Sequence, residues 1–253
     1  IDLGEGYHMP RNFDSILITS SDGTAIQNAV EYIQDGGTIS LEGEFKLNRT
    51  INIKKNLTIR GLNNAVLDRS EASKKDRVIR CQGNITLENL TIIGGLKTKG
   101  GGINISGGSV RIINCDIHDN FSWLGGGGIC SLAETLILQS CDIHDNGSAA
   151  LGGGLFIGKG QGTITDCSIT RNTAAMTGGG VLSSNCDITM ENCKITENKS
   201  TFAGTGVKIK GTSKLKAISC DISDNFIMSL DQGIPNPEAN ISYVDNSTYE
   251  EVK

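Results

Sequence analysis

The residues with the clearest chemical potential are two copies of one short motif, 26 positions apart. The sequence Asp-Ile-His-Asp-Asn occurs at 116–120 and again at 142–146. These segments contain two of the chain's three histidines, together with closely spaced carboxylates. Neighbouring carboxylates shift one another's pKa values, imidazole exchanges protons near neutral pH, and hard cations prefer oxygen ligands. The two motifs therefore predict either an acid–base site or a cation site.

Seven residues in or near these motifs have side chains suited to such a site. Arg171 and Lys194 add positive charge further along the chain, and Trp123 is its only tryptophan. A polysaccharide lyase needs a basic group, and sugar sites usually present an aromatic ring. The candidates are Asp116, His118, Asp142, His144 and Arg171 for catalysis, Trp123 and Lys194 for substrate binding, and Asp116 and Asp142 as metal ligands. No cofactor is predicted, with Ca²⁺ as the alternative at the last pair.

Each candidate also has a purely structural explanation, and we favour these explanations at the level of sequence. Duplication of a repeat would copy the Asp-Ile-His-Asp-Asn motif without giving it a function. Arg171 and Lys194 fit a salt-bridged surface, where single ion pairs contribute little to stability. Trp123 fits a packed hydrophobic corner better than an aromatic sugar platform.

Both motifs belong to a longer repeat that fills the middle of the chain. A glycine-rich element recurs every 26 residues and ends at Gly102, Gly128, Gly154, Gly180 and Gly206. A second element starts 13 or 14 residues later, with its cysteines at Cys115, Cys141, Cys167, Cys193 and Cys220. Two motifs that stay in phase over five copies indicate a solenoid.

Within each copy the apolar residues alternate with the period of a β-strand. One copy shows this in three short runs, which are Ile103 and Ile105, Val110 and Ile112, and Cys115 and Ile117. No copy has room for a crossover helix, so equivalent strands can meet only if each copy makes one full turn and stacks about 4.8 Å from the next. The sequence predicts an all-β fold, a right-handed parallel β-helix of about seven three-stranded coils.

Stacking places identical residues in columns along the solenoid. The cysteine column fits small buried side chains better than disulfides or zinc ligands, because the chain has no Cys-x-x-Cys pair. An asparagine column is expected to form hydrogen bonds along the stack, at Asn120, Asn146, Asn172, Asn198 and Asn225.

The two ends of the solenoid need covers, because open sheet edges invite pairing with other chains. Ile26, Ala29, Val30 and Ile33 have helical spacing and predict a capping helix that follows Ser21 and Asp22. Residues 69–77 are polar and predict a loop that leaves the coil. The expected units are an N-terminal segment with the helix (1–35), the β-helix (36–225) and a C-terminal cap and tail (226–253).

Three segments carry a resemblance to a known superfamily. They are Asp-Gly-Thr-Ala-Ile-Gln-Asn-Ala-Val at 22–30, Gly-Gly-Thr-Ile-Ser-Leu at 36–41, and Ile-Asn-Ile-Lys-Lys-Asn-Leu-Thr-Ile-Arg-Gly at 51–61. Together they resemble the entry of pectate-lyase-like β-helices. The later coils resemble β-helix repeats of microbial surface proteins, including polymorphic outer membrane proteins. The resemblance implies the fold over roughly residues 20–225, and the superfamily holds lyases, hydrolases, epimerases and non-catalytic adhesins alike.

Composition narrows the choice of partner. A net charge of -5 gives no reason to expect nucleic acid, and no apolar run is long enough to span a membrane. Uniform coils and few aromatic residues favour a non-catalytic extracellular or cell-surface module, adhesin-like or bound to a polysaccharide or a host-surface ligand. The alternative is a carbohydrate-active enzyme, a lyase or hydrolase of an acidic polysaccharide, that uses the face of His118 and His144.

Overall fold

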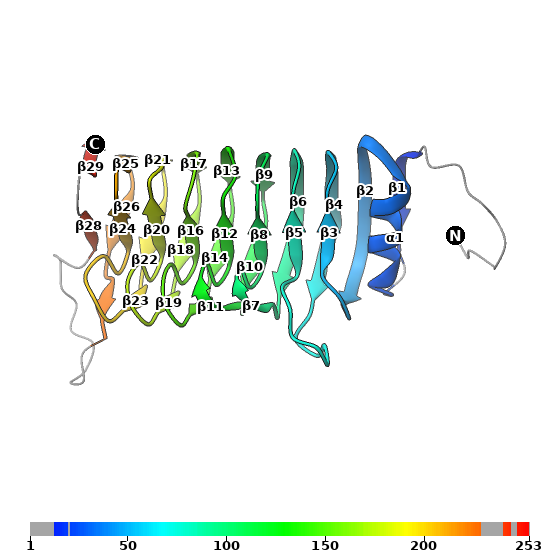
Figure 1. Ribbon diagram of the computed structural model, residues 1–253, viewed down its shortest axis with the longest axis horizontal. Helices are drawn as coiled ribbons and strands as arrows, with labels where there is room; N and C mark the ends of the chain where they lie inside the picture. Colours follow the sequence, from blue (N-terminus) through cyan, green and yellow to red (C-terminus); the bar gives the residue numbers. More distant parts are fainter. Residues whose placement is uncertain (1–12, 20, 229–239, 244–246, 253) are drawn as a thin grey trace.

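Parallel strands stacked along one axis make up almost the whole molecule (Figure 1). This computed structural model describes residues 13–19, 21–228, 240–243 and 247–252. Every strand pair is parallel, and the strands form three sheets that run along the rod. The predicted parallel β-helix is confirmed.

The first sheet, which we call the β8 face, has eight strands. They are β3 (Ile51–Ile53), β5 (Ile79–Cys81), β8 (Ile103–Ile105), β12 (Ile129–Ser131), β16 (Leu155–Ile157), β20 (Val181–Ser184), β24 (Val207–Lys210) and β28 (Ile241–Tyr243). This sheet indicates about eight turns, against the expected count of about seven.

The second sheet has fifteen strands and bends into two faces. It begins with β1 (Phe13–Ile18), β2 (Ile33–Lys46), β4 (Leu57–Asp68) and β6 (Ile85–Ile93). One branch, the β9 face, continues as β9 (Ser109–Ile113), β13 (Thr135–Gln139), β17 (Gln161–Thr165), β21 (Asp187–Glu191), β25 (Lys214–Ile218) and β29 (Thr248–Val252). The other branch, the β10 face, continues as β10 (Asp116–His118), β14 (Asp142–His144), β18 (Ser168–Thr170), β22 (Lys194–Thr196) and β26 (Asp221–Ser223).

A short fourth strand completes each later coil and adds to the three strands that the periodicity predicts. These strands form a six-stranded sheet of β7 (Leu96–Lys99), β11 (Phe121–Gly125), β15 (Gly147–Ser148), β19 (Thr173–Ala174), β23 (Lys199–Ser200) and β27 (Phe226–Ile227). Most are only two residues long, too short for a period-two pattern to be recognisable in the sequence.

The bend between the β9 and β10 faces comes from one column of left-handed residues. Asn89, Asn114, Ser140, Asp166, Asn192 and Ser219 have φ angles between 50° and 54°. Asparagine, aspartate and serine tolerate this conformation because their short polar side chains can hydrogen-bond the local backbone. Each coil therefore turns at the same place, and the inward residues stay aligned.

The inside of the rod is a continuous apolar core. Inward isoleucines such as Ile117 and Ile143 have no exposed surface and are direct strand partners. The cysteines of the repeat lie in the same core, where all but Cys220 are fully buried. All eight cysteines of the chain are free thiols. The prediction of stacked, unpaired, buried cysteines is therefore confirmed.

A ladder of buried asparagines runs along the corner after the β10 face. In each step the amide oxygen of one asparagine accepts hydrogen bonds from the backbone and the side chain of the preceding one, as between Asn120 and Asn146 at 3.2 and 3.1 Å. Asn240 extends the ladder beyond Asn225 at 3.1 and 3.0 Å. The predicted hydrogen-bonded column is confirmed, with one more member than the sequence indicated.

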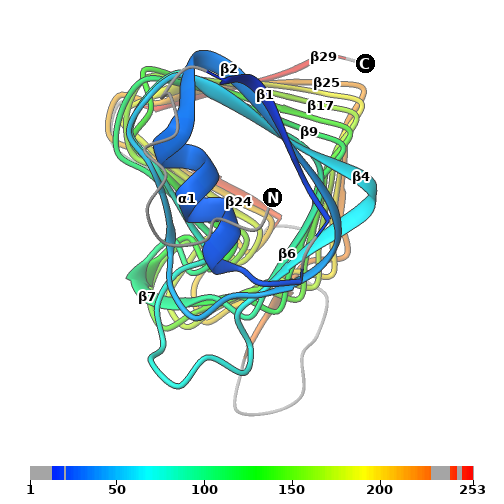
Figure 2. The same cartoon turned by 90° about the vertical axis from the view of Figure 1, so that its right-hand side faces the viewer.

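The helix α1 (Thr24–Tyr32) lies across the N-terminal end of the rod (Figure 2). Its buried side chains are Ile26, Ala29 and Val30, as the spacing predicts. The N-cap position is Gly23 rather than Ser21 or Asp22, and Asp22, just before it, accepts a hydrogen bond from the backbone of Thr24 at 2.8 Å. The helix ends at Tyr32, one residue before the last position of the predicted helical spacing, because Ile33 is already extended and starts β2.

The regions outside the regular coils are partly described. The polar stretch between β4 and β5 forms the predicted loop, visible as the cyan excursion in Figure 2. The described part of the C-terminal segment adds β28 and β29 in register with β24 and β25. The predicted unit boundaries stay predictions, and residues 1–12 and 229–239 lie outside the described residues.

Candidate functional site

The β10 face holds the two Asp-Ile-His-Asp-Asn motifs in register. Strand pairing sets Asp116 beside Asp142 and His118 beside His144. Because the isoleucine between them points into the core, the aspartate and histidine of each strand point outward. The duplication therefore produces one outward cluster of two imidazoles and several carboxylates, as the sequence predicts.

The two imidazole rings stack on each other. Their centroids are 4.7 Å apart and their planes differ by 9°. The Nδ1 atom of each ring meets the carboxylate of the next residue, at 2.8 Å for His118 and Asp119 and at 2.7 Å for His144 and Asp145. Both rings are thus fixed in the same orientation, with their Nε2 edges facing the same way.

The Nε2 edges of both rings face the carboxylate of Asp116. Its Oδ1 lies 3.0 Å from Nε2 of His144, and its Oδ2 lies 3.8 Å from Nε2 of His118. The first distance is a hydrogen bond and the second is too long for one. Within the described residues, these three side chains are the one group whose ligand atoms lie within 4.8 Å of one another.

Arg171 closes the cluster on the opposite edge of the ring. Its guanidinium donates to both carboxylate oxygens of Asp145, with the shortest contact at 2.8 Å. Arg171, Asp145 and Asp119 all occupy left-handed positions at the corner after their strands, with φ between 51° and 55°. The positive charge of Arg171 is therefore paired with the carboxylate of Asp145, one coil before it.

These contacts shift the pKa of two groups in the cluster. Burial alone would lower the pKa of His144, but its hydrogen bond to Asp145 and the negative charges of Asp142, Asp116 and Asp145 outweigh burial and raise it. The hydrogen bonds from Arg171, with that of His144, hold the pKa of Asp145 below its usual value. The contacts of the cluster therefore favour the charged forms of both His144 and Asp145.

The remaining candidates lie apart from this cluster. Asp142 is the exposed neighbour of Asp116 in the strand register. Lys194 follows Asp142 after two further strand spacings, about 10 Å along the rod. Trp123 belongs to β11, in a different sheet. The assigned catalytic, metal and substrate roles of all seven residues stay predictions.

Trp123 belongs to an exposed apolar column rather than to a packed corner. Its ring meets only the edge of Phe121, at a centroid distance of 5.2 Å, and is 55% exposed. The neighbouring position carries large apolar side chains in three coils, which are Leu124, Met176 and Phe202. These positions recur every 26 residues in the sequence, and that spacing could have revealed the column. The alanine at the equivalent position between Leu124 and Met176 interrupts the run of large apolar side chains, so the column was not recognised.

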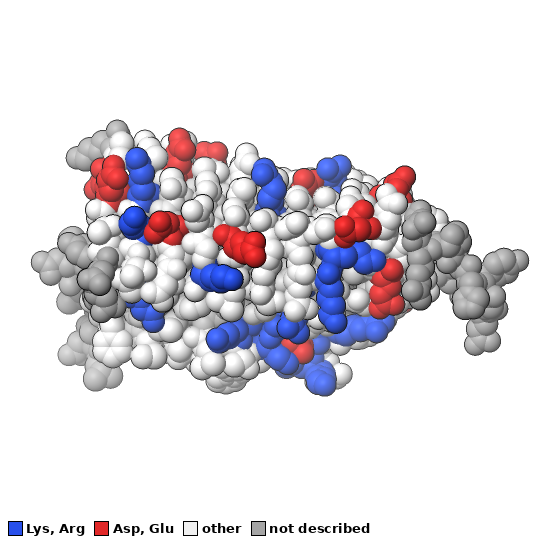
Figure 3. All heavy atoms as spheres, turned by 45° about the horizontal axis from the view of Figure 1, so that its top comes forward, with Lys and Arg blue, Asp and Glu red and all other residues white. Residues whose placement is uncertain are grey.

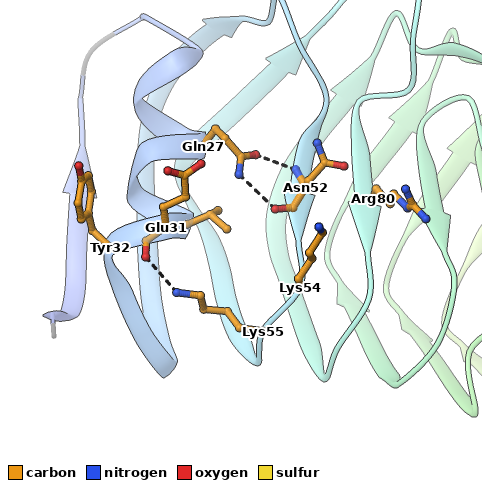
Figure 4. Close-up of a pocket in the computed structure, with 8 residues that line it drawn as sticks. Gln27, Glu31, Tyr32, Asn52, Lys54, Lys55 and Arg80 are labelled. Carbon is orange, nitrogen blue, oxygen red and sulfur yellow. Dashed lines mark hydrogen bonds between the residues drawn. The ribbon is translucent and has the colours of Figure 1, made fainter. Parts of the chain in front are cut away.

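Sequence reasoning missed two adjoining pockets at the N-terminal end. The larger, of about 690 Å³, lies between α1 and strands β3 and β5 (Figure 4). The second, of about 390 Å³, continues it toward the polar loop. Both are lined by Gln27, Glu31 and Asn52. The charged residues that line one or both are the cations Arg49, Lys54, Lys55, Arg69, Lys74 and Arg80 and the carboxylates Glu31 and Asp76.

Several polar groups in the larger pocket are fixed in place. Gln27 and the backbone of Asn52 exchange two hydrogen bonds, at 3.3 and 2.8 Å. Lys55 donates to backbone oxygens of Glu31 and Ile33 at 3.2 and 2.8 Å. The buried Nε of Arg80 has no hydrogen-bond partner among the described residues.

Positive charge gathers at this end of the molecule. Figure 3 shows Lys and Arg side chains gathered along the lower part of the N-terminal half of the visible face, with Asp and Glu side chains beside and above them. Six cations against two carboxylates line the two pockets of a chain whose net charge is -5. These pockets are therefore suited to an anionic ligand.

Comparison with known protein families agrees with the fold. A family model described as "Right handed beta helix region" matches residues 55–222 and, in an overlapping match, residues 151–250. The chain belongs to this right handed beta helix family. No curated protein matches the chain.

Membership of the right handed beta helix family accounts for the coils but not for either site. The match begins at residue 55, after α1 and β3. The larger pocket thus combines family coils with a helix from outside the matched region. No helix in the described residues is both long and apolar enough to cross a membrane.

Proposed function

We propose that this chain is a non-catalytic β-helix module, extracellular or on a cell surface, that binds an acidic polysaccharide at its N-terminal pockets. The observation that carries the proposal is the concentration of six cations around two adjoining pockets on an acidic chain. Acidic polysaccharides are components of cell surfaces and extracellular matrices, and the proposed location follows from that ligand.

The pocket side chains match the groups of an acidic sugar chain. Lysine and arginine pair with carboxylates or sulfates, and arginine does so through two parallel hydrogen bonds. Gln27 and Asn52 supply amide groups beside them, which can pair with sugar hydroxyls. Lys54 is exposed, Arg80 is half-buried, and both line the larger pocket, so both are able to contact a ligand there.

The β10 face supports the non-catalytic part of the proposal. Both ring nitrogens of His144 are bound to carboxylates, and Arg171 is held by Asp145. A general base needs an unprotonated nitrogen within reach of the substrate, which a doubly paired imidazole does not offer. The cluster fits a set of ion pairs that ties three coils together.

One observation favours the alternative of a polysaccharide lyase or hydrolase. Nε2 of His118 lies 3.8 Å from Asp116, beyond hydrogen-bonding distance, so this nitrogen is the accessible one of the pair. In such an enzyme His118 would act as the base, with Asp116 and His144 beside it. This alternative predicts turnover that depends on His118.

A single panel of polysaccharides separates the two functions. Purified protein is offered pectin, alginate and glycosaminoglycans, with a neutral glucan as control, and both binding and release of reducing ends or unsaturated products are measured. The proposal predicts saturable binding to an acidic polymer, no binding to the neutral one, and no products. Product release that disappears in His118→Ala would refute it in favour of the enzyme, and no binding to any acidic polymer would refute it outright.

A further inference from the structure

The cluster on the β10 face has a second property, independent of polysaccharide binding. We infer that Asp116, His118 and His144 form a binding site for one divalent transition-metal ion of the Zn²⁺ class. Within the described residues they are the one group of three metal-ligating side chains whose ligand atoms all lie within 4.8 Å. No other part of the molecule is needed to complete the site, because the open positions face solvent.

The positions of the three ligand atoms are compatible with zinc after a small rearrangement. Zinc binds imidazole nitrogen at about 2.1 Å and carboxylate oxygen at a similar distance, which puts two ligands of a tetrahedral ion about 3.4 Å apart. Oδ1 of Asp116 and Nε2 of His144 are already 3.0 Å apart, and Oδ2 of Asp116 is 3.8 Å from Nε2 of His118. The most widely separated pair of ligand atoms, which lie within 4.8 Å, has to close by up to about 1.4 Å, so metal binding requires these side chains to rotate toward each other.

The residues around the three ligands orient them as in known metal sites. In a metal-bound histidine, the ring nitrogen that does not bind the metal usually donates its N–H to a carboxylate, and this hydrogen bond fixes the tautomer and the ring orientation. Here Asp119 is the carboxylate partner of Nδ1 of His118 at 2.8 Å, and Asp145 is the partner of Nδ1 of His144 at 2.7 Å. When a metal displaces the proton that Nε2 of His144 shares with Asp116, each ring keeps its proton on Nδ1 and binds the metal through the lone pair of Nε2.

The charges nearby also suit a cation at this place. Asp142 lies next to Asp116 in the register and adds negative charge without being one of the three ligands. Arg171 contacts the Nδ1 edge of His144 at 3.3 Å, on the side away from Asp116. Its positive charge is paired with Asp145, so it does not occupy the proposed metal position.

The chemistry of the ligands selects the class of metal. Imidazole nitrogen suits Zn²⁺, Cu²⁺, Ni²⁺ and Fe²⁺, whereas Ca²⁺ takes six to eight oxygen ligands. A site with two imidazole ligands therefore favours a transition-metal ion over the Ca²⁺ ion that the sequence suggested for Asp116 and Asp142. The buried cysteines do not compete, because repeat thiols such as Cys115 and Cys141 sit in the core against backbone carbonyls.

The test is zinc binding by the metal-free, full-length protein near pH 7.5, measured by calorimetry and by competition with a chromogenic chelator. One Zn²⁺ per chain is expected, with binding lost in His118→Ala and in His144→Ala. Asp119→Asn is expected to weaken binding about 10- to 100-fold through the orientation of His118. Asp142→Asn is the matched control, since it removes a neighbouring carboxylate outside the ligand set, and it is expected to keep the affinity within about threefold.

X-ray absorption at the zinc edge gives a readout that does not depend on variants. Two imidazole nitrogens with oxygen and no sulfur are expected in the first shell. Absence of zinc binding, unchanged zinc binding in both histidine variants, or a sulfur-containing shell would each overturn the inference. Polysaccharide binding by His118→Ala and His144→Ala is expected to be unchanged, so failure of the metal site and failure of the proposed function give different results.

Discussion

The carboxylate of Asp116 binds the imidazole of His144 from the next coil, Oδ1 to Nε2 at 3.0 Å, and not that of His118 on its own strand. The contact is diagonal, because the strand register places Asp116 beside Asp142. Copying one coil therefore created a link between coils that a single coil does not contain. The same geometry explains why the cluster can both tie coils together and offer ligand atoms to a metal.

This diagonal pair is expected to contribute little to stability in the absence of metal. Asp116 is 45% exposed, and ion pairs at such positions contribute about 0.2–1 kcal/mol. A double-mutant cycle of Asp116→Asn and His144→Ala, followed by denaturant unfolding, should give a coupling energy in that range. A coupling above about 2 kcal/mol would show that the cluster is a principal source of stability.

Substitutions in the asparagine ladder should lower the free energy of unfolding far more than substitutions in this ion pair. Asn172 is fully buried, donates to the carbonyl of Ile143 at 2.8 Å and to Asn198 at 3.1 Å, and accepts from Asn146. Asn172→Ala leaves these groups unpaired in the core. At about 1–3 kcal/mol for a buried unsatisfied group, we expect a loss of about 3 kcal/mol in the free energy of unfolding.

Asn104→Ala is the matched control for the ladder, because Asn104 lies on the outward side of β8 and is half-buried. Its free energy of unfolding should change by less than about 0.5 kcal/mol. Equal losses in the two variants, measured by urea denaturation, would show that the ladder has no special role.

The backbones of neighbouring coils approach each other closely at the glycine-rich element of the repeat, and this contact gives a second stability test. A methyl group on Gly127 would lie 2.3 Å from the carbonyl oxygen of Gly147 and 2.4 Å from that of Gly153. Neither is a flexible side chain, so Gly127→Ala must displace a neighbouring coil, at a cost of about 1–3 kcal/mol. At Gly107 a methyl group meets nothing within 4 Å, so Gly107→Ala should be nearly neutral. A thermal melt of the two variants compares them directly.

Acid should weaken the contact between β2 and β4. Asp68 is 5% exposed, and although burial opposes it, hydrogen bonds from Lys46 at 2.6 Å and the backbone of Ser70 at 2.7 Å lower its pKa. A lowered folded-state pKa stabilises the fold above the unfolded value of about 3.9 and loses that effect as the pH falls through the folded value.

Asp68→Asn should therefore cost about 1–3 kcal/mol at neutral pH and almost nothing at pH values well below 3.9. Urea denaturation of wild type and variant across this range measures the difference. An equal loss of stability at neutral and acidic pH would contradict the assignment.

The sequence predicted the coils well because the same residues face the core in every turn. Val110 and Ile112 pair with Ile85 and Leu87 of the coil before, which are buried in the same core. The cysteine and asparagine columns followed for the same reason. Because each repeat stacks on its neighbours in the same register, the position of a residue within one repeat predicts where the equivalent residues lie in all the others.

The sites could not be predicted to the same depth. Sequence reasoning placed His118 and His144 together, but the diagonal contact depends on side-chain rotamers that no spacing encodes. The basic pockets combine Gln27 from the helix with Arg80 from β5, more than fifty positions away, outside any repeat.

The central claim is that the N-terminal pockets bind an acidic polysaccharide, and one affinity measurement tests it most directly. Wild type, the double variant Lys54→Ala/Arg80→Ala, and the control Lys214→Ala are titrated with the acidic polymer that binds best. Lys214 is an exposed cation of β25, at the other end of the rod. Two lost charge contacts should weaken binding about tenfold, and the control should bind like wild type. Equal affinity of all three proteins would contradict the account.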